Sequence, residues 1–257
     1  MRQILWGLFK KVVIADNCAH YVNEIFENFT DLSGGTLILG AILFSFQIYC
    51  DFSGYSDIAI GTARLFGFDL MKNFAFPYFS RDVAEFWRKW HISLSTWFRD
   101  YIYIPLGGSR VNKKKQIRNV LIIFLVSGLW HGANWTFLAW GSIHAILYLP
   151  SVIYNQNRKQ LNNINTTSFI GNLIDFAKIV TTFSLITTSW IFFRSKNITE
   201  AFNYISRIIN ESFSVDSNYQ IIQLPIIILF FMLIEWFNRK KDFGLDLNIR
   251  KTTKLTR

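Results

Sequence analysis

The sequence predicts an all-α, multi-pass transmembrane fold in which some helices are short, tilted or re-entrant and one amphipathic helix lies at the interface. Hydrophobic residues make up 51% of the 257 residues, and aromatic residues make up 18%. The mean hydropathy of +0.23 is high for a soluble domain of this length. The apolar residues also form blocks of membrane-spanning scale, and short basic clusters flank these blocks.

Five segments are candidates for membrane-spanning helices. They are residues 37–50, 117–130, 135–154, 169–193 and 221–237. Several are shorter than the roughly 20 residues that cross a bilayer, so we expect them to extend through polar flanks, to tilt or to re-enter. The pattern predicts about five helices but does not fix their ends.

The net charge of +10 comes from short clusters beside the apolar blocks. These clusters are Lys10 with Lys11, Arg110 to Arg118, Arg158 with Lys159, and residues 239–241. Such a distribution is typical of cytoplasmic loops, and no nucleic-acid-binding module accompanies it. We therefore expect no nucleic-acid partner, and the basic tail at 239–257 predicts a cytoplasmic C-terminus.

The remaining polar stretches are predicted to connect helices outside the membrane. Residues 155–168 are rich in Asn, Gln, Lys and Thr, and residues 195–220 mix charge with a weak amphipathic pattern. No repeat or Pro-rich or Gly-rich linker divides the chain, so residues 1–257 are predicted to form one membrane domain. Cys18 and Cys50 form no CxxC pair, and we expect both to be buried apolar side chains.

Residues 82–103 form the clearest amphipathic pattern and predict one helix. Polar side chains recur at spacings of three and four, while aromatic and aliphatic side chains fill the opposite side. His91 falls on the apolar side, in line with Trp87 and Leu94. Two interpretations remain open for His91: an interfacial histidine satisfied by backbone or water, or a histidine in a polar cavity roofed by tryptophans.

His131 lies at the far end of the apolar run that begins at Ile117. About 14 helical residues place it roughly 20 Å from the basic cluster around Lys114. A histidine at membrane depth is a functional candidate, because an unpaired polar group there is costly. The alternative is a histidine that is hydrogen-bonded between packed helices. Gly128 and Gly132 flank His131 and would let a substrate or a neighbouring helix approach closely.

The other polar residues in apolar surroundings favour structural roles. His144 and His20 have no partner that the sequence identifies. Asp51 and Asp57 interrupt the apolar region between residues 37 and 60, where they would bind a cation, receive a proton or brace a break in a helix. Bracing of a helix end is the favoured interpretation, because Ser, Gly and Asp suit caps and turns.

Several catalytic chemistries are excluded by missing motifs. The sequence has no HExxH motif, no HxxxH pair, no GxSxG elbow and no Walker loop. Metal-dependent hydrolysis, serine hydrolysis and ATP-driven transport are therefore disfavoured.

Five stretches carry a family resemblance. They are GLFKKVVIADN (7–17), FQIYCDFSGYSDIAIG (46–61), FWRKWHISLSTWFRDYIYIPLGGSR (86–110), SGLWHGANWTFLAWGSIHA (127–145) and SWIFFRS (189–195). Together they resemble the membrane-bound O-acyltransferase superfamily, in particular the bacterial branch of alginate O-acetyltransferase membrane subunits. The stretches follow family order and reach about three quarters of the chain.

The resemblance implies an O-acetyltransferase of the cytoplasmic (inner) membrane. It makes His131 the catalytic histidine and His91 the second histidine of the active-site channel. The other side chains expected to line the channel are Trp87, Trp90, Trp130, Asn134, Asp51 and Asp57. A neutral imidazole suits general-base catalysis, and Asn134 or a nearby backbone N–H is a candidate to steady the oxyanion.

The resemblance also implies substrates and partners. A cytosolic thioester, expected to be acetyl-CoA, would supply the acetyl group, with no tightly bound cofactor and no metal. The acceptor would be an extracytoplasmic polysaccharide, either an alginate-like polymer or peptidoglycan. An extracytoplasmic acetyl-transferring or esterase-like protein would complete the transfer, and membrane lipid would surround the chain.

The chain departs from the family pattern in its length. In family members the GLFKKVVIADN stretch lies well inside the protein, whereas here it begins at residue 7. We therefore expect the chain to correspond to the C-terminal part of a longer fold without several N-terminal helices, which leaves its activity alone in question. Two alternatives remain: D-alanyl transfer to teichoic acid, as in the related branch, or a non-catalytic membrane scaffold.

Overall fold

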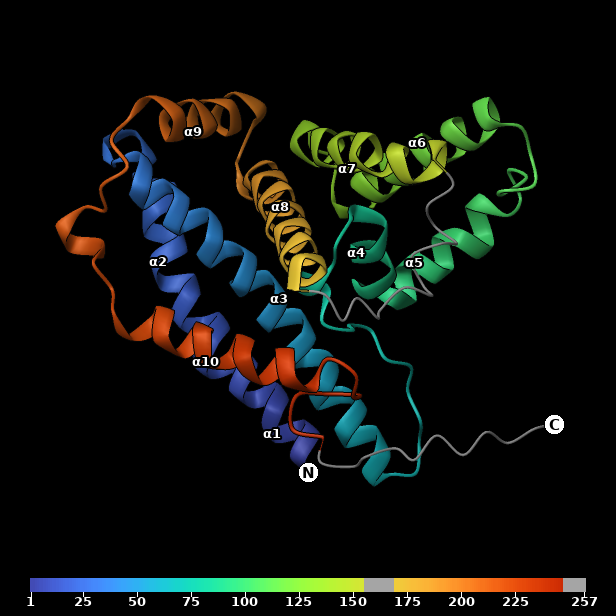
Figure 1. The fold of residues 1–257 in the computed structure, drawn as a ribbon, viewed down its shortest axis with the longest axis horizontal. Helices are drawn as coiled ribbons and strands as arrows, with labels where there is room; N and C mark the ends of the chain where they lie inside the picture. Colours follow the sequence, from blue (N-terminus) through green and yellow to red (C-terminus); the bar gives the residue numbers. More distant parts are fainter. Residues whose placement is uncertain (155–168, 247–257) are drawn as a thin grey trace.

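The computed structural model describes residues 1–154 and 169–246, and these residues form helices with no β-strand among them (Figure 1). The principal helices are α1 (Arg2–Leu8), α2 (Asp16–Glu27), α3 (Gly34–Leu65), α4 (Val83–Lys89), α5 (Ile92–Phe98), α6 (Lys113–His131), α7 (Trp135–Ile153), α8 (Phe169–Arg194), α9 (Ile198–Asn210) and α10 (Gln223–Asn238). All five segments predicted to be helical coincide with helices, namely α3, α6, α7, α8 and α10. The all-α prediction is thus confirmed.

Three of the described helices are long and apolar enough to cross a membrane: α3, α7 and residues Ile170–Arg194 of α8. Helix α6 begins with the basic cluster at Lys113–Lys115, so its apolar part is shorter than the helix itself. Helix α10 is apolar but has only 16 residues. These two helices therefore match the expectation of short segments beside full spans.

The N-terminal helices pack on α3 through a contact between glycines. A π-helical segment, Phe9–Ala15, joins α1 to α2, and the three elements run along α3 (Figure 1). A Cβ atom on Gly7 would lie 2.6 Å from the carbonyl oxygen of Gly54, and one on Gly54 would lie 2.8 Å from that of Gly7. Only glycine permits this approach, because any larger side chain would collide with backbone.

Helices α6 and α7 form an antiparallel hairpin that is also closed by glycines. A Cβ atom on Gly128 would lie 2.4 Å from the carbonyl oxygen of Phe137, and one on Gly141 would lie 2.4 Å from that of Phe124. The expectation that Gly128 lets a neighbouring helix approach is therefore confirmed. This close packing brings the end of α6, with His131, against the start of α7.

Helix α8 lies between α3 and α7 (Figure 1). An aromatic core fills the junction of these helices. Trp190 of α8 lies against Trp90 at a ring-centroid distance of 5.3 Å and stacks on Trp140 of α7 at 5.7 Å. Cys18 and Cys50 are buried free cysteines, as predicted. The core thus fixes the α4–α5 region between α3, α7 and α8.

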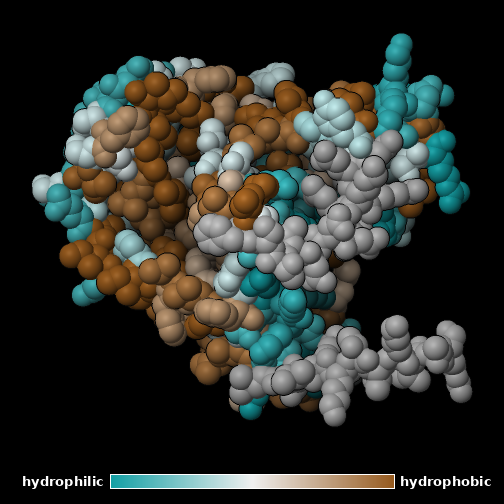
Figure 2. Space-filling model, viewed as in Figure 1, coloured by the Kyte–Doolittle hydropathy of each residue, from teal (hydrophilic) through white to brown (hydrophobic). Residues whose placement is uncertain are grey.

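The outer faces of α8 and α10 are apolar and exposed. On α8 these side chains are Leu173, Ile174, Phe176, Val180 and Leu185, and on α10 they are Ile226, Leu229, Phe230, Leu233 and Phe237. Figure 2 shows extensive hydrophobic surface on this face of the molecule. Such a surface suits lipid better than water, in agreement with a membrane protein.

Two sequence predictions about polar segments differ from the structure. Residues 195–220, predicted as a connection, contain the amphipathic helix α9, whose Ala201 and Tyr204 are buried in the core. The predicted break at Asp51–Asp57 is absent, because α3 continues to Leu65. The predicted connection at 155–168 and residues 247–257 of the basic tail lie outside the described residues.

The start of α3 is tied to a segment far along the chain. Ser33 caps the helix, its hydroxyl accepting a hydrogen bond from the backbone N–H of Thr36. The Asp216 carboxylate accepts hydrogen bonds from the Ser33 backbone N–H at 2.9 Å and from the Thr36 hydroxyl at 2.8 Å. These donors lower the pKa of Asp216, with the Ser33 N–H as the largest cause.

Replacing Asp216 by Asn should lower the melting temperature of the detergent-solubilised protein, because a neutral amide makes weaker hydrogen bonds than a carboxylate. The stabilisation by Asp216 is present above its ordinary pKa of 3.8 and is lost as the pH falls below it. The Asn variant should therefore lose less stability than the wild type on acidification through this range. Asp31→Asn, at an exposed position nearby, is the control. Equal effects of the two substitutions would contradict the assignment.

Candidate functional site

The backbone breaks at His91, so residues 82–103 do not form the single helix that the sequence predicts. Helix α4 ends before Trp90, and α5 begins at Ile92. Between them His91 has φ 43° and ψ 55°, the left-handed conformation that residues other than glycine adopt rarely. The break turns α5 away from the direction of α4 (Figure 1). Strained backbone of this kind persists only where its surroundings fix it.

The segment just before α4 fixes this break through backbone hydrogen bonds. The Ala75 N–H donates to the Lys89 carbonyl at 2.9 Å, and the Ile92 N–H donates to the Asn73 carbonyl at 2.9 Å. The Asn73 side chain also accepts from the Ser93 N–H at 3.1 Å. These bonds replace the helical ones that the break removes. The amphipathic pattern missed it because nothing between Trp90 and Ile92 is a glycine or proline.

His91 and His131 both lie close to Trp130. The Trp130 ring centroid is 6.3 Å from that of His91 and 4.9 Å from that of His131. Burial, and in second place the nearness of His131, lower the pKa of His91 to about 4. His91 is therefore neutral near pH 7. The two histidines that the sequence singles out therefore lie near the same tryptophan.

His131 sits in an aromatic frame. Its ring centroid lies 5.2 Å from that of Trp140, 5.0 Å from that of Phe193 and 6.1 Å from that of Phe137. The side chain is half-buried, and no residue in ranges 1–154 and 169–246 makes a hydrogen bond to its ring nitrogens. The alternative of a histidine hydrogen-bonded between helices is thus not observed there. Both nitrogens are left for a reacting group.

A cavity of about 600 Å³ lies between the α4–α5 region and the α6–α7 hairpin. Its lining is mostly aromatic and aliphatic, with hydroxyl groups and two guanidinium groups, and includes Trp87, Arg88, Ser95, Phe98, Arg99 and Tyr148. Ser127 and Ile92 also line it. Ser127 is one helical turn before His131, and Ile92 directly follows His91, so the cavity adjoins the segments that carry both histidines, although neither histidine lines it.

Of the other predicted channel residues, only Trp87 and Trp130 lie with the cavity or the histidines. Trp90 is 4% exposed and belongs to the core. The Asn134 side chain caps α7, accepting from the Thr136 N–H at 3.1 Å and donating to the Lys196 carbonyl at 3.1 Å. Both ends of its amide are therefore engaged within the fold.

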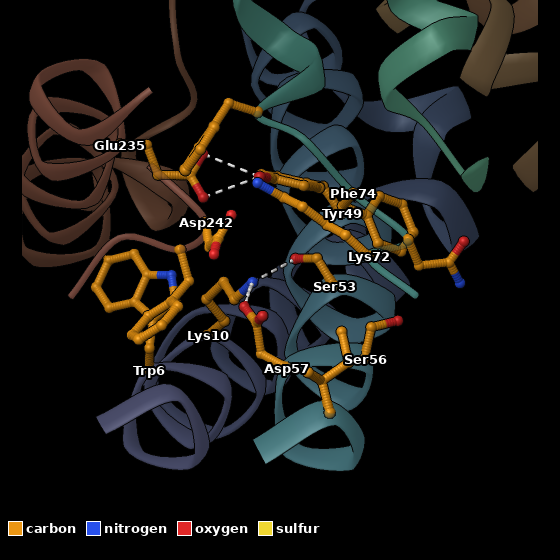
Figure 3. Close-up of a pocket in the computed structure, with 14 residues that line it drawn as sticks. Trp6, Lys10, Tyr49, Ser53, Ser56, Asp57, Lys72, Phe74, Glu235 and Asp242 are labelled. Atoms are coloured by element: carbon orange, nitrogen blue, oxygen red, sulfur yellow. Dashed lines mark hydrogen bonds and ion pairs between the residues drawn. The ribbon is translucent and has the colours of Figure 1, made fainter. Parts of the chain in front are cut away.

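Asp57 lies in a buried charge cluster on α3, apart from the histidine pair (Figure 3). Lys10 Nζ is 2.6 Å from the Asp57 carboxylate and donates to the Ser53 hydroxyl at 3.0 Å. In the same cluster the Tyr49 hydroxyl donates to the Glu235 carboxylate at 2.8 Å. The space among these groups is about 10 Å³, room for a single water. The cluster joins the N-terminal helices, α3 and α10.

Asp51 forms a separate, half-exposed ion pair with Lys11. Both aspartates therefore brace contacts between helices rather than the end of one helix, which corrects the favoured prediction. No group of three His, Cys, Asp or Glu side chains among the described residues is arranged to hold a metal ion.

Comparison with known proteins identifies the family of this chain. The sequence model of the membrane-bound O-acyltransferase family matches residues 1–194. The chain belongs to the membrane-bound O-acyltransferase family. The resemblance carried by the five sequence stretches is thereby confirmed.

The curated relatives include enzymes of two acyl-transfer branches. A peptidoglycan O-acetyltransferase of Helicobacter pylori is 42% identical over 195 residues, which are 76% of this chain and 36% of the relative. A probable alginate O-acetylase of Pseudomonas aeruginosa is 34% identical over 258 residues, 96% of this chain and 46% of the relative. A teichoic acid D-alanyltransferase of Bacillus subtilis is 32% identical over 154 residues, 54% of this chain and 39% of the relative. The chain spans less than half the length of these membrane-bound O-acyltransferase relatives.

Two features of this family member were not identified from the sequence. Glu235 is 2% exposed within the apolar helix α10, and a lone carboxylate in that run was the available signal. His144 was assigned a structural role without a partner, yet it joins α4, α7 and α8 through hydrogen bonds to Trp87 and Ser189. Neither partner is visible from spacing, because both come from distant parts of the chain.

The strained backbone at His91 predicts that a glycine variant at this position is more stable than an alanine variant. His91→Gly should be more stable than His91→Ala by about 1 kcal/mol, because a left-handed conformation costs glycine nothing. Unfolding in detergent measures the difference. At Lys178, a half-exposed position within α8, the order should reverse, because alanine favours helix over glycine. An Ala variant at His91 as stable as the Gly variant would contradict the strain.

The buried cluster predicts a contrast between the two aspartates. Asp57→Asn should lower the free energy of unfolding by about 3–5 kcal/mol, because it leaves the Lys10 ammonium, 3% exposed, without its carboxylate. Asp51→Asn should cost less than about 1 kcal/mol, because its pair with Lys11 is half-exposed. The double variant Lys10→Met, Asp57→Leu should recover much of the loss. Equal losses for Asp57→Asn and Asp51→Asn would contradict this assignment.

Proposed function

We propose that the chain forms the catalytic part of a membrane O-acetyltransferase that modifies an extracytoplasmic polysaccharide. The observation that carries this proposal is the imidazole of His131, unpartnered among the described residues, which shares Trp130 with His91 close to an amphiphilic cavity. Membership of the O-acyltransferase family and similarity to O-acetylating relatives support it.

The cavity suits the thioester donor. Its apolar and aromatic lining fits an acyl group with a flexible arm, and the guanidinium groups of Arg88 and of Arg99, the latter paired with Asp100, suit phosphates. The basic residues Lys113–Lys115 begin α6 on the side away from His131, as expected for a cytosolic entry. We take acetyl-CoA as this donor, used as a substrate rather than held as a cofactor.

His131 acts as the general base of the transfer. Its neutral imidazole takes the proton of an acceptor hydroxyl while the hydroxyl oxygen attacks the thioester carbonyl. A C–O bond forms, the C–S bond breaks, and the thiolate leaves with the electron pair. His91, neutral and in the second position beside Trp130, lines the same reaction space. The surrounding aromatic rings exclude water, which would otherwise hydrolyse the thioester.

The relatives support a proposal for the acceptor and for the location. The similar proteins are named for alginate and for peptidoglycan, so we propose a polysaccharide of that kind outside the cytoplasmic membrane. An extracytoplasmic acetyl-transferring or esterase-like protein then completes the modification. The D-alanyltransferase relatives match a smaller share of this chain, which makes D-alanyl transfer to teichoic acid the second candidate.

Replacing His131 by Ala in cells that express the chain should reduce acetate on the envelope polysaccharide by about 10²- to 10⁴-fold, the usual contribution of a general base. Radiolabelled acetate measures the transfer, and labelled D-alanine in a parallel culture tests the second candidate. His20→Ala, at an exposed position on α2, is the matched control, with membrane levels of both variants checked by immunoblot. Unchanged acetylation in the His131 variant would overturn the assignment, and His131-dependent labelling by D-alanine alone would favour the alternative.

A further inference from the structure

His144 is a fully buried histidine that joins three helices. It lies on α7 with 0% of its surface exposed. The Trp87 indole Nε1–H of α4 donates to His144 Nδ1 at 3.2 Å. On the other side of the ring, His144 Nε2 lies 2.9 Å from the Ser189 hydroxyl of α8. Both ring nitrogens therefore have a partner, unlike those of His131.

The partners determine where the imidazole proton lies. An indole N–H only donates, so Nδ1 of His144 must accept and carries no proton. The neutral ring then has its proton on Nε2, which donates to the Ser189 oxygen. Ser189 is free to donate its own proton to the Ile186 carbonyl, 2.7 Å away. Each of these three hydrogen bonds then contains one proton, so every donor and acceptor in the series has a partner.

The same placement of protons shows why His144 cannot readily accept a second proton. A second proton could be added only at Nδ1, where it would point at the Trp87 N–H. Protonation would therefore break the bond to Trp87 and leave a charge among buried aromatic rings. His144 is for this reason a poor proton acceptor for catalysis, and its effect must pass through the side chain that it holds.

Trp87 is placed where such an effect matters. It lines the 600 Å³ cavity and packs against Trp140 at a ring-centroid distance of 5.8 Å. Trp140 in turn lies 5.2 Å from His131. Helix α4, which carries Trp87, ends at the break that presents His91. The indole thus lies between the cavity and Trp140, one of the rings around His131, and its orientation depends on the bond to His144.

We propose that His144, fixed as the neutral Nε2–H tautomer between Trp87 and Ser189, is a positioning residue that orients Trp87 as the inner wall of the donor cavity beside His131. The tautomer rests on geometry alone, whereas the effect on the donor rests on the proposed function. The two parts are therefore tested by separate measurements.

Two amide substitutions separate the two hydrogen bonds of His144. The amide oxygen of Asn reaches the position of Nδ1 and can accept from Trp87, whereas the amide nitrogen of Gln reaches the position of Nε2 and can donate to Ser189. His144→Phe keeps the ring volume and removes both bonds. His20→Asn and His20→Gln, on the exposed side of α2, are matched controls.

Transfer from labelled acetyl-CoA in membranes that contain the chain measures the effect. We expect His144→Gln and His144→Phe to raise the KM for acetyl-CoA about tenfold or more, while His144→Asn stays within about threefold of the wild type. The pH profile of kcat/KM should keep its shape in the Asn variant, because His144 does not titrate in the reaction. Equal KM values for Gln and Asn, or a displaced pH profile for Asn, would overturn the positioning role.

Side-chain ¹⁵N NMR of histidine-labelled protein in detergent tests the tautomer without any activity. One histidine, assigned by its loss in His144→Asn, should show a bare Nδ1 and a protonated Nε2 throughout the neutral range. Trp87→Phe should change its Nδ1 signal, whereas His20→Asn should not. A protonated Nδ1 would overturn the tautomer. If wild-type membranes transfer no acetyl group while the NMR signals are as expected, the proposed function fails and the tautomer stands.

Discussion

The backbone break between α4 and α5 is the constraint on which the arrangement of the site depends. A continuous helix over residues 82–103 would carry α5 onward in the direction of α4, without the turn at His91. The hydrogen bonds from Asn73 and Ala75 instead hold the chain in a left-handed turn at His91. Since those bonds are backbone to backbone, the turn persists despite its steric cost. The histidine pair follows from this turn.

Close helix packing is the second requirement, and glycines provide it. The α6–α7 hairpin is drawn together at Gly128 and Gly141, which sets His131 at the turn of the hairpin against Trp140. The aromatic rings of α7 and α8 then enclose the imidazole without donating to it. The same fold thus gives one histidine, His144, a full set of partners and leaves another, His131, with none among the described residues. The proposed chemistry and its support are thus assigned to two histidines on consecutive helices.

Much of this organisation is visible in the sequence, and what is not has a physical reason. Apolar blocks located α3, α6, α7, α8 and α10, because burial in lipid or in a helical core imposes the pattern directly. Motifs singled out His91 and His131. The turn at His91 was missed because hydrogen bonds to Asn73 and Ala75 impose it, whereas the local helix propensity does not predict it. Asp57 was placed at the channel by the family resemblance, and its pairing with Lys10 was missed because the two residues are 47 positions apart and on different elements.

The attachment of Ser33 and Thr36 to Asp216 has a consequence for biogenesis. The start of α3 emerges from the ribosome well before its carboxylate partner, which lies about 180 positions later. Tyr49 likewise waits for Glu235, 186 positions downstream. Helices can insert one after another, but these polar contacts close only after residues as far as Asp216 and Glu235 have been synthesised. Until then Ser33, Thr36 and Tyr49 lack these partners, and in this interval membrane chaperones and quality-control proteases would act on the nascent protein.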